Sequence, residues 1–320
     1  MKDILTVGTW NLGMGNGGAQ GMIDGISSNS DKIKNMTMEQ IKIINETDMD
    51  IVALQEIGSS FLNAHVNTAA MIKKQLSQYN FDYYTYLRMR QQQLIYGKAN
   101  LVHKRLNHIK KVKHIISEDQ CFDKGIPDLT FLERQVLKMA IPIFNNRNLV
   151  ASIIDLPKGK VAALNVHLTP MSYSPFQKKR IAEFKKIIEI ACEYYKNGYY
   201  VILNGDFNFS LDPTKENRSD VFPDELKDLL NTIGAQFIFP DTATHAKINK
   251  KNEIVKESIF DGFILFPGLE LDDIKVILPE VDFDHLTEDD LKRMNFFASD
   301  HALLQSRIIL KDLNRKKSLY

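Results

Sequence analysis

Residues 5–18 read LTVGTWNLGMGNGG, an apolar, strand-like run that leads into a glycine-rich segment. Gly13, Gly15 and Gly18 match the G-x-G-x-x-G spacing of dinucleotide-binding loops. In such loops a helix begins at the last glycine, because its free N–H groups hold the pyrophosphate. Here the chain continues as AQGMIDGISSNSDK without helical periodicity, and the first helical pattern starts near Met36. The context therefore argues against a dinucleotide site.

The glycine-rich segment is better explained as a flexible loop. The first strand ends at Asn11, and we expect a loop over about residues 13–35 that lies close to a functional site. Thr37 and Gln40 have the spacing of a capping box, which places the next helix after this loop. The informative features are then the polar residues at the ends of apolar strands.

The composition is that of an ordinary globular protein. The chain has 320 residues, of which 44% are hydrophobic, and a net charge of +1. Because no internal repeat and no Pro-, Ser- or Gly-rich linker divides it, we expect a single domain over residues 1–320 with a basic tail at about 311–320. We also expect a monomer. With so little net charge, any attraction to nucleic acid or membranes must come from local patches.

The sequence also predicts a cytoplasmic protein. Cys121 and Cys192 lie far apart and have no metal-ligand spacing, which is typical of a reducing compartment, although one disulfide between them is left open. No apolar run is long enough for a transmembrane segment. Strand-like sequence from Ile4 onward leaves no room for a signal peptide, so export without a cleaved leader is the alternative.

The order of the apolar runs predicts a mixed-sheet α/β fold. β-Branched runs predict strands at about 4–10, 51–56, 98–103, 136–143, 149–155, 161–167, 199–205, 258–265 and 302–309. Helical periodicity predicts helices at about 36–48, 65–78, 175–196, 223–233 and 287–294. The short connections NNRN and PKGK predict antiparallel hairpins from residue 136 to residue 167.

Several predicted strands end in a hard oxygen ligand or a histidine. These residues are Asn11 (TWN), Glu56 (LQE), His167 (NVH), Asp206 and Asn208 (NGDFN), Asp261 (SIFD), and Asp300 and His301 (SDH). Each alone is weak evidence, because a single Asp or Asn after a strand usually caps a turn. Together they supply carboxylates, amides and imidazoles without thiolate, a set that suits Mg²⁺ or Mn²⁺ and acid–base chemistry on a phosphate.

These blocks resemble, in order, those of the endonuclease/exonuclease/phosphatase superfamily, which includes pancreatic-type deoxyribonucleases, abasic-site endonucleases and sphingomyelinases. TWN, LQE, NVHL, NGDFN, IFDGFIL and SDH span nearly the whole chain, and YGKANLVHK and ERQVLKMAI look like the family's central strands. The resemblance implies a four-layer α/β sandwich, in which two mixed β-sheets pack face to face between outer helices. It places the site at one edge, where strand ends from both sheets converge.

The resemblance also implies roles for the residues. It makes Glu56 the principal metal ligand, with Asn11 and Asp300 near the metal. It implies that Asp206 orients or activates the attacking water and that Asn208 bonds a phosphate oxygen or the nucleophile. His301 would be the general base or acid, with Asp261 fixing its tautomer. His167 would stabilise the charge of the transition state or protonate the leaving oxygen. A divalent ion and a histidine suit this chemistry, because charge grows on an already anionic phosphodiester.

The substrate is predicted less directly. The run HKRLNHIKKVKH, residues 103–114, follows a strand that we expect to approach the site. It would contact a nucleic acid through Lys104, Arg105, Lys110, Lys111 and Lys113, with Tyr83, Tyr84 and Tyr86 nearby for stacking on bases. The alternative for such a run is a solvated face, and the alternative for such aromatics is the core.

The chain is therefore expected to be a Mg²⁺- or Mn²⁺-dependent phosphodiesterase, most simply a DNA or RNA nuclease. A sphingomyelinase-like phospholipid phosphodiesterase and a phosphatase of small phosphate esters are the enzymatic alternatives. The non-enzymatic alternative is an inactive binding module on the same scaffold, and the completeness of the set of polar strand-end residues argues against it. The sequence leaves open whether cleavage is endo or exo and whether one or two metals act.

Overall fold

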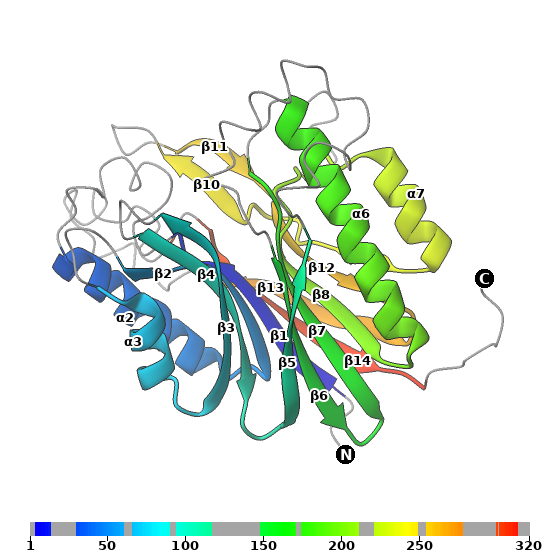
Figure 1. The fold of residues 1–320 in the computed structure, drawn as a ribbon, viewed down its shortest axis with the longest axis horizontal. Helices are drawn as coiled ribbons and strands as arrows, with labels where there is room; N and C mark the ends of the chain where they lie inside the picture. The colour runs from blue at the N-terminus through cyan, green and yellow to red at the C-terminus, as the bar shows by residue number, and fades with distance from the viewer. Residues whose placement is uncertain are drawn as a thin grey trace.

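The computed structural model describes residues 4–13, 30–60, 66–89, 94–116, 148–170, 174–210, 221–248, 254–277, 299 and 301–312. Two six-stranded sheets form the centre of the molecule (Figure 1). The first sheet has the strand order β13 (Leu269–Ile277), β14 (Leu303–Leu310), β1 (Ile4–Asn11), β2 (Ile51–Ser60), β4 (Leu94–His103) and β3 (Tyr79–Met89). The second has the order β5 (Asn107–Ile115), β6 (Asn148–Leu156), β7 (Gly159–His167), β8 (Tyr200–Asp206), β12 (Asp261–Leu265) and β9 (Gln236–Ile238).

Each sheet contains one parallel pair at its middle, β1 with β2 and β7 with β8, and its other pairs are antiparallel. The carboxyl ends of parallel neighbours lie at the same edge of a sheet. The ends of these four central strands are therefore the places where the fold can gather side chains from distant parts of the sequence.

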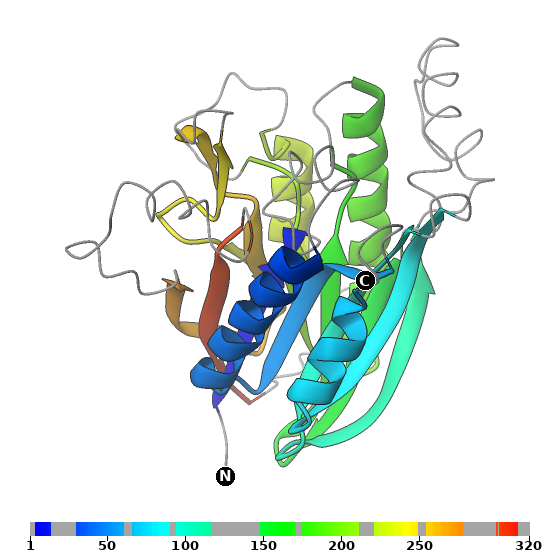
Figure 2. The same cartoon turned by 90° about the vertical axis from the view of Figure 1, so that its left-hand side faces the viewer.

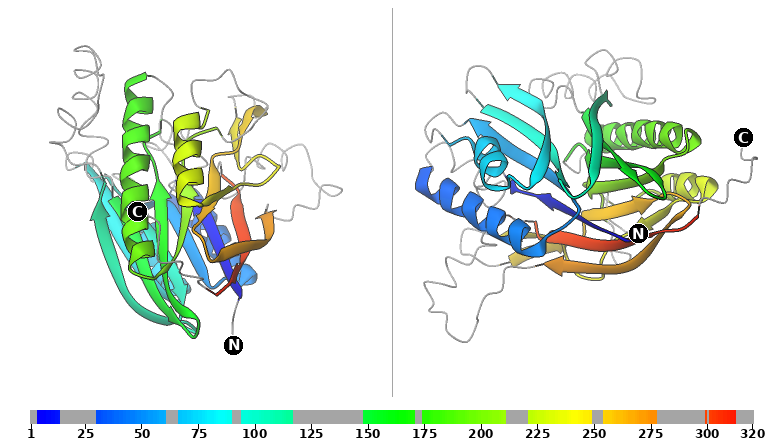
Figure 3. Two further views of the ribbon diagram at one scale, coloured as in Figure 1. Left: turned by 90° about the vertical axis from the view of Figure 1, so that its right-hand side faces the viewer. Right: turned by 90° about the horizontal axis from the view of Figure 1, so that it is seen from below.

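Helices cover the outer faces of both sheets. Figure 2 shows α2 (Ser30–Thr47) and α3 (Thr68–Gln75) over the first sheet, and Figure 3 shows α6 (Ser174–Lys196) and α7 (Asp224–Ile233) over the second. Three apolar clusters separate the layers: one between α2, α3 and the first sheet, one between the two sheets, and one between the second sheet and α6 and α7. The predicted four-layer α/β sandwich is confirmed.

The middle cluster follows from the period-2 pattern of the strands. Leu5 and Val7 of β1 face Val161 and Ile202 of the second sheet, whereas Trp10 belongs to the cluster beneath the helices. Successive side chains of β1 point to opposite faces, and apolar residues on both faces are typical of a strand that is buried on both sides. Among the described residues, no helix is long and apolar enough to cross a membrane.

Several predicted elements differ from the structure in their bounds. The helix expected from residue 36 begins at Ser30, so the loop expected to reach residue 35 ends earlier, and Thr37 bonds Ile33 O inside the helix instead of capping it. The hairpin of β6 and β7 is confirmed. The predicted strand 136–143, the helix 287–294, most of the glycine-rich loop and the tail from residue 313 lie outside the described residues.

Candidate active site

Three predicted residues of the second sheet stand in one row. His167 at the end of β7 is the register partner of Asp206 at the end of β8, and Asp206 is in turn the partner of Asp261 at the start of β12. All three side chains are buried. Asp261 was expected at the end of a strand, but it begins β12; because β12 runs antiparallel to β8, its start lies at the same edge as the ends of β7 and β8.

The first sheet supplies the facing residues. Asn11 ends β1, Glu56 lies in the neighbouring β2, and His301 comes just before β14, on the other side of β1. Trp10 Nε1 donates a hydrogen bond of 2.7 Å to His301 O, which fixes the backbone that carries this histidine. The predicted convergence of strand ends from both sheets is therefore present.

Asp206 is the centre of this arrangement. Its Oδ2 accepts a hydrogen bond of 3.0 Å from Asn11 Nδ2, and its Oδ1 accepts one of 2.8 Å from the backbone N–H of Asn208. The Nε2 atoms of His167 and His301 each lie 3.8 Å from Oδ2, beyond hydrogen-bond length. Two imidazoles thus flank one buried carboxylate oxygen.

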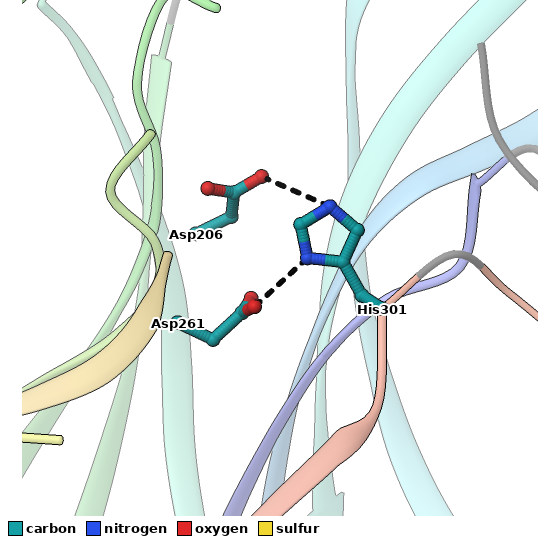
Figure 4. A group of neighbouring side chains, drawn as sticks. All are labelled: Asp206, Asp261 and His301. Carbon is teal, nitrogen blue, oxygen red and sulfur yellow. Dashed lines mark hydrogen bonds and ion pairs between the residues drawn. The ribbon is translucent and has the colours of Figure 1, made fainter. Parts of the chain in front are cut away.

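Asp261 and His301 form a tighter pair, which Figure 4 shows with Asp206. His301 Nδ1 and Asp261 Oδ2 are 2.8 Å apart, a hydrogen bond in which an ionised Asp261 accepts the proton on Nδ1. That tautomer leaves the lone pair of Nε2 on the side of Asp206. The geometry is the one that general acid–base chemistry requires of a histidine oriented by a carboxylate.

Glu56 approaches the site from the side of His167. Its Oε1 lies 3.6 Å from His167 Nε2, and its side chain is 21% exposed, in contrast with the buried Asp206 and Asp261. Glu56 has a backbone φ of 52°, at a register shift between β2 and β4 that lies between Leu54 and Ile57. A bulge with a positive φ re-aims a side chain, and both features are frequent next to active sites. The strand expected to end at Glu56 in fact continues to Ser60.

The block NGDFN has its own backbone requirements. A Cβ on Gly205 would overlap the backbone oxygen of Val166 on β7, so only glycine permits this approach of β8 to β7 beside His167. Asn208 has a φ of 54°, which Asn tolerates better than most residues. Its Nδ2 donates to Leu168 O, so Asn208 ties the segment after β8 to the segment after β7.

Burial raises the pKa of Asp206 from 3.8 to about 6. His301 lowers this pKa, Asp261 raises it, and the hydrogen bonds from Asn11 and Asn208 lower it. Desolvation is thus the leading cause, and a positive charge at this point would favour the ionised carboxylate.

The donor set fits a hard divalent cation. Asp206, Asp261 and His301 offer ligand atoms that all lie within 4.8 Å of one another. Asp261 Oδ1 is buried and has no hydrogen-bond partner among the described residues, an unsatisfied oxygen of the kind that an ion or water satisfies. The two carboxylates are typical ligands of Mg²⁺ or Mn²⁺, whereas imidazole nitrogen is more typical of transition metals such as Zn²⁺.

Of the predicted metal ligands, only Glu56 and Asn11 can be placed. Asn11 Oδ1 accepts a hydrogen bond of 3.0 Å from Gly13 N, so both ends of its amide are engaged, one with the backbone and one with Asp206. Asp300 lies outside the described residues.

The structure divides the predicted basic residues into two groups that lie apart from each other. β4 runs antiparallel to β2: its amino end lies level with Glu56, since Gly97 pairs with Ile57, but its carboxyl end lies at the opposite edge, where Val102 pairs with Ile51. The expectation that the basic run follows this strand at the site is therefore wrong. Lys104 and Arg105 follow it there, and Arg105 bonds Asp48 and Asp50.

Lys110, Lys111 and Lys113 instead lie exposed on β5, which runs toward the site edge. Lys113 is level with Val150 and, through it, with Asn165, two residues before His167. Lys111 Nζ lies 5.1 Å from the ring centre of Tyr84. Tyr83 is half-buried and stacks on Phe81, and the side chain of Tyr86 is outside the description.

Two residues next to the site were not predicted. His245 packs its ring against that of His301, with centroids 4.7 Å apart, and Thr244 precedes it. The sequence contains no strand-end signal at either position, because β10 (His245–Ile248) is short and lies in a separate two-stranded hairpin with β11 (Ile254–Ser258).

Comparisons with known proteins agree with this geometry. Residues 8–234 match the model of "Endonuclease/Exonuclease/phosphatase family 2". No curated protein sequence matches the chain. Among solved structures, an endonuclease/exonuclease/phosphatase from Beutenbergia cavernae is similar with a TM-score of 0.64 and 14% identity, over 97% of this chain and 72% of that one.

Two further structures are TDP2 proteins. Truncated Caenorhabditis elegans TDP2 has a TM-score of 0.56 and 18% identity, over 96% of this chain and 97% of that one. D. rerio TDP2 complexed with single strand DNA product has a TM-score of 0.56 and 14% identity, over 96% and 99%. At these identities the similarity shows a common fold.

Proposed function

Because the chain belongs to endonuclease/exonuclease/phosphatase family 2, whose name describes enzymes that cleave phosphate esters, we propose that it is a divalent-metal-dependent phosphodiesterase that cleaves DNA or RNA. The observation that carries this proposal is the arrangement around Asp206, where His167 and His301 flank one buried carboxylate oxygen. Two imidazoles beside one carboxylate are groups that general acid–base hydrolysis of a phosphodiester uses.

In this proposal His301 transfers the proton of the attacking water. With Asp261 accepting from Nδ1, Nε2 is the ring nitrogen that accepts the proton, and it lies on the side of Asp206. Asp206 orients the water, and Asn11 and the Asn208 N–H hold Asp206 in place. His167 stabilises charge on the phosphate oxygens or protonates the leaving oxygen, because its Nε2 faces the same carboxylate from the other side.

Glu56 is the proposed principal holder of the metal, which would supply positive charge against the phosphate oxygens when bound. Glu56 is partly exposed, and Mg²⁺ retains waters when it binds proteins. An ion on Asp261 Oδ2 and His301 Nδ1 would have to replace their 2.8 Å hydrogen bond, whereas one on Asp261 Oδ1 would not. The unsatisfied Asp261 Oδ1 supports this second placement, and comparing Glu56→Gln with Asp261→Asn separates the two.

Two observations support nucleic acid as the substrate. Lys110, Lys111 and Lys113 lie exposed on a strand that runs toward the site edge. One similar structure, D. rerio TDP2, holds a single strand DNA product. A phospholipid or a small phosphate ester is the alternative substrate, and an inactive binding module is the alternative to an enzyme.

A panel of substrates tests the proposal. Plasmid DNA, single-stranded DNA, RNA, sphingomyelin and inositol phosphates are each incubated with Mg²⁺, Mn²⁺ or EDTA. We expect cleavage of a nucleic acid in Mg²⁺ or Mn²⁺ and none in EDTA. Cleavage of sphingomyelin or inositol phosphate alone would move the chain to an alternative, and an inert protein would support the binding module.

A further inference from the structure

Thr244 and His245 lie between the two partners of the Asp261–His301 hydrogen bond. Thr244 is fully buried, and its backbone N–H donates a hydrogen bond of 3.1 Å to Ser258 O at the end of β11. This bond anchors the residue to the hairpin. Neither residue is part of the chemistry proposed above, so their position next to it calls for a separate explanation.

On one side, Thr244 holds the backbone of Asp261. Its Oγ1 accepts the N–H of Phe260 at 3.1 Å and the N–H of Asp261 at 3.2 Å. A single side-chain oxygen therefore satisfies two consecutive N–H groups where β12 begins, of which that of Asp261 is buried and that of Phe260 part-buried. Removing it would leave both donors without their acceptor, which disfavours the backbone conformation that aims the Asp261 carboxylate.

On the other side, the same residue holds the backbone after His301. Thr244 O accepts the N–H of Ala302 at 2.8 Å, and His245 pairs with His301 as an isolated antiparallel bridge. The rings of His245 and His301 pack at 60° with centroids 4.7 Å apart, and the ring of Phe260 lies on His245 at 5.1 Å. The segment thus contacts both the backbone and the ring of His301.

We infer that Thr244 is a positioning residue, whose hydroxyl and carbonyl oxygens together set the distance between Asp261 and His301. This inference rests on the proposed function, because it assigns Thr244 to the orientation of the proton-transferring histidine. The two halves of the pair come from separate segments, since Asp261 begins β12 and His301 precedes β14, so a bond of 2.8 Å needs an element that fixes one relative to the other. Misplacement of a catalytic group by about 1 Å costs on the order of 100-fold in rate.

The test compares Thr244→Val, which keeps the branched shape and loses the hydroxyl, with Thr244→Ser, which keeps the hydroxyl. Thr232→Val is the control, since it removes a hydroxyl that bonds Asp228 O on the remote helix α7. The first readout is the proton NMR resonance of His301 Nδ1–H, assigned by its loss in His301→Asn. The second is kcat and KM on the nucleic acid that the protein cleaves.

We expect Thr244→Val to lose the His301 resonance or shift it upfield and to lower kcat about 10- to 100-fold at constant KM. Thr244→Ser and Thr232→Val should keep the resonance and a kcat within about twofold of wild type. An unchanged resonance in Thr244→Val, or an equal loss in Thr244→Ser, would overturn the inference. If Thr244→Val does not fold, Thr244→Ala is measured with the same expectations.

The NMR readout needs no substrate. An inert wild-type protein would refute the proposed function while the resonance still decides the role of Thr244.

Discussion

The side-chain amide of Asn11 donates a hydrogen bond of 3.0 Å to Oδ2 of Asp206, which joins the ends of β1 and β8 across 195 positions of sequence. The bond holds the central carboxylate against both sheets at once. It also lowers the pKa of Asp206, because it stabilises the ionised form against the effect of burial. Asn11 therefore holds the direction of the Asp206 carboxylate and partly offsets the rise of its pKa on burial.

Asn11→Ala should lower kcat about 10- to 100-fold and the free energy of unfolding by about 1 kcal/mol. Asn204→Ala is a matched control, since Asn204 Nδ2 also bonds across the sheets, to Gly8 O at 2.8 Å, two residues deeper in β8. We expect the control to lose similar stability and to keep kcat. Equal kcat losses in the two variants would show that kcat depends on hydrogen bonds between the sheets in general, and not on the bond to Asp206.

Glu56→Gln should raise the Mg²⁺ concentration needed for half-maximal rate about tenfold or more, because an amide lacks the charge of the carboxylate. Excess Mg²⁺ should recover part of the rate. Glu270→Gln, at an exposed ion pair with Lys311, is the control and should leave the requirement unchanged. A larger shift in Asp261→Asn than in Glu56→Gln would place the metal at Asp261 instead.

His301→Ala and His167→Ala should each lower kcat about 100-fold or more, and the double variant should lose less than the product, because both groups act on one transition state. His108→Ala is the control: His108 Nε2 pairs with Asp82 Oδ2 at 2.7 Å, another Asp–His pair remote from the site. The control should change stability and not kcat. Near-normal turnover of either single variant would remove that histidine from the mechanism.

The raised pKa of Asp206 predicts a pH effect on stability in EDTA. The folded pKa of about 6 exceeds the ordinary 3.8, so proton uptake stabilises the folded state. This contribution is complete below about pH 4 and is lost as the pH rises through 6. Asp206→Asn abolishes this contribution. As the pH rises from 5 to 7, the free energy of unfolding of the variant should therefore rise by about 1 kcal/mol relative to that of wild type. Urea unfolding at both pH values measures the difference, and a constant difference would contradict the raised pKa.

Substitution of the exposed lysines of β5 tests whether the substrate is a nucleic acid or a smaller phosphate ester. The triple substitution of Lys110, Lys111 and Lys113 by Ala should weaken DNA binding with little change in kcat. It should also flatten the slope of log K against log salt by roughly 0.7 to 0.9 for each lysine that pairs with a phosphate in the wild-type complex. Lys104→Ala is the control at the opposite edge of the sheets. Identical slopes for all three proteins would remove β5 from the substrate path.

The sequence was sufficient to predict the layers and the gathering of polar strand-end residues at one edge. Central strands are continuous apolar runs, so their ends, such as Asn11 and Asp206, can be located from hydrophobicity alone. The elements that were missed are those without such runs. β5 and β13, for example, are edge strands of the two sheets. Many of their residues are exposed and polar, so their sequences resemble those of loops.

The distances within the site could not be predicted. The bulge at Glu56 depends on how β2 pairs with β4, and the direction of β4 depends on its partner, which reversed the expected position of Lys104. Thr244 acts through backbone hydrogen bonds that no residue pattern encodes. These features arise from the packing of segments far apart in the chain.

Cleavage of single-stranded DNA and RNA by wild type and by His301→Ala, each in Mg²⁺ and in EDTA, tests the central claim most directly. The paired variant excludes a contaminating nuclease, because both proteins are purified in the same way. We expect shortened strands only with the wild-type protein in Mg²⁺. Cleavage that survives EDTA, or that is equal in the two proteins, would contradict a metal-dependent phosphodiesterase in which His301 transfers the proton.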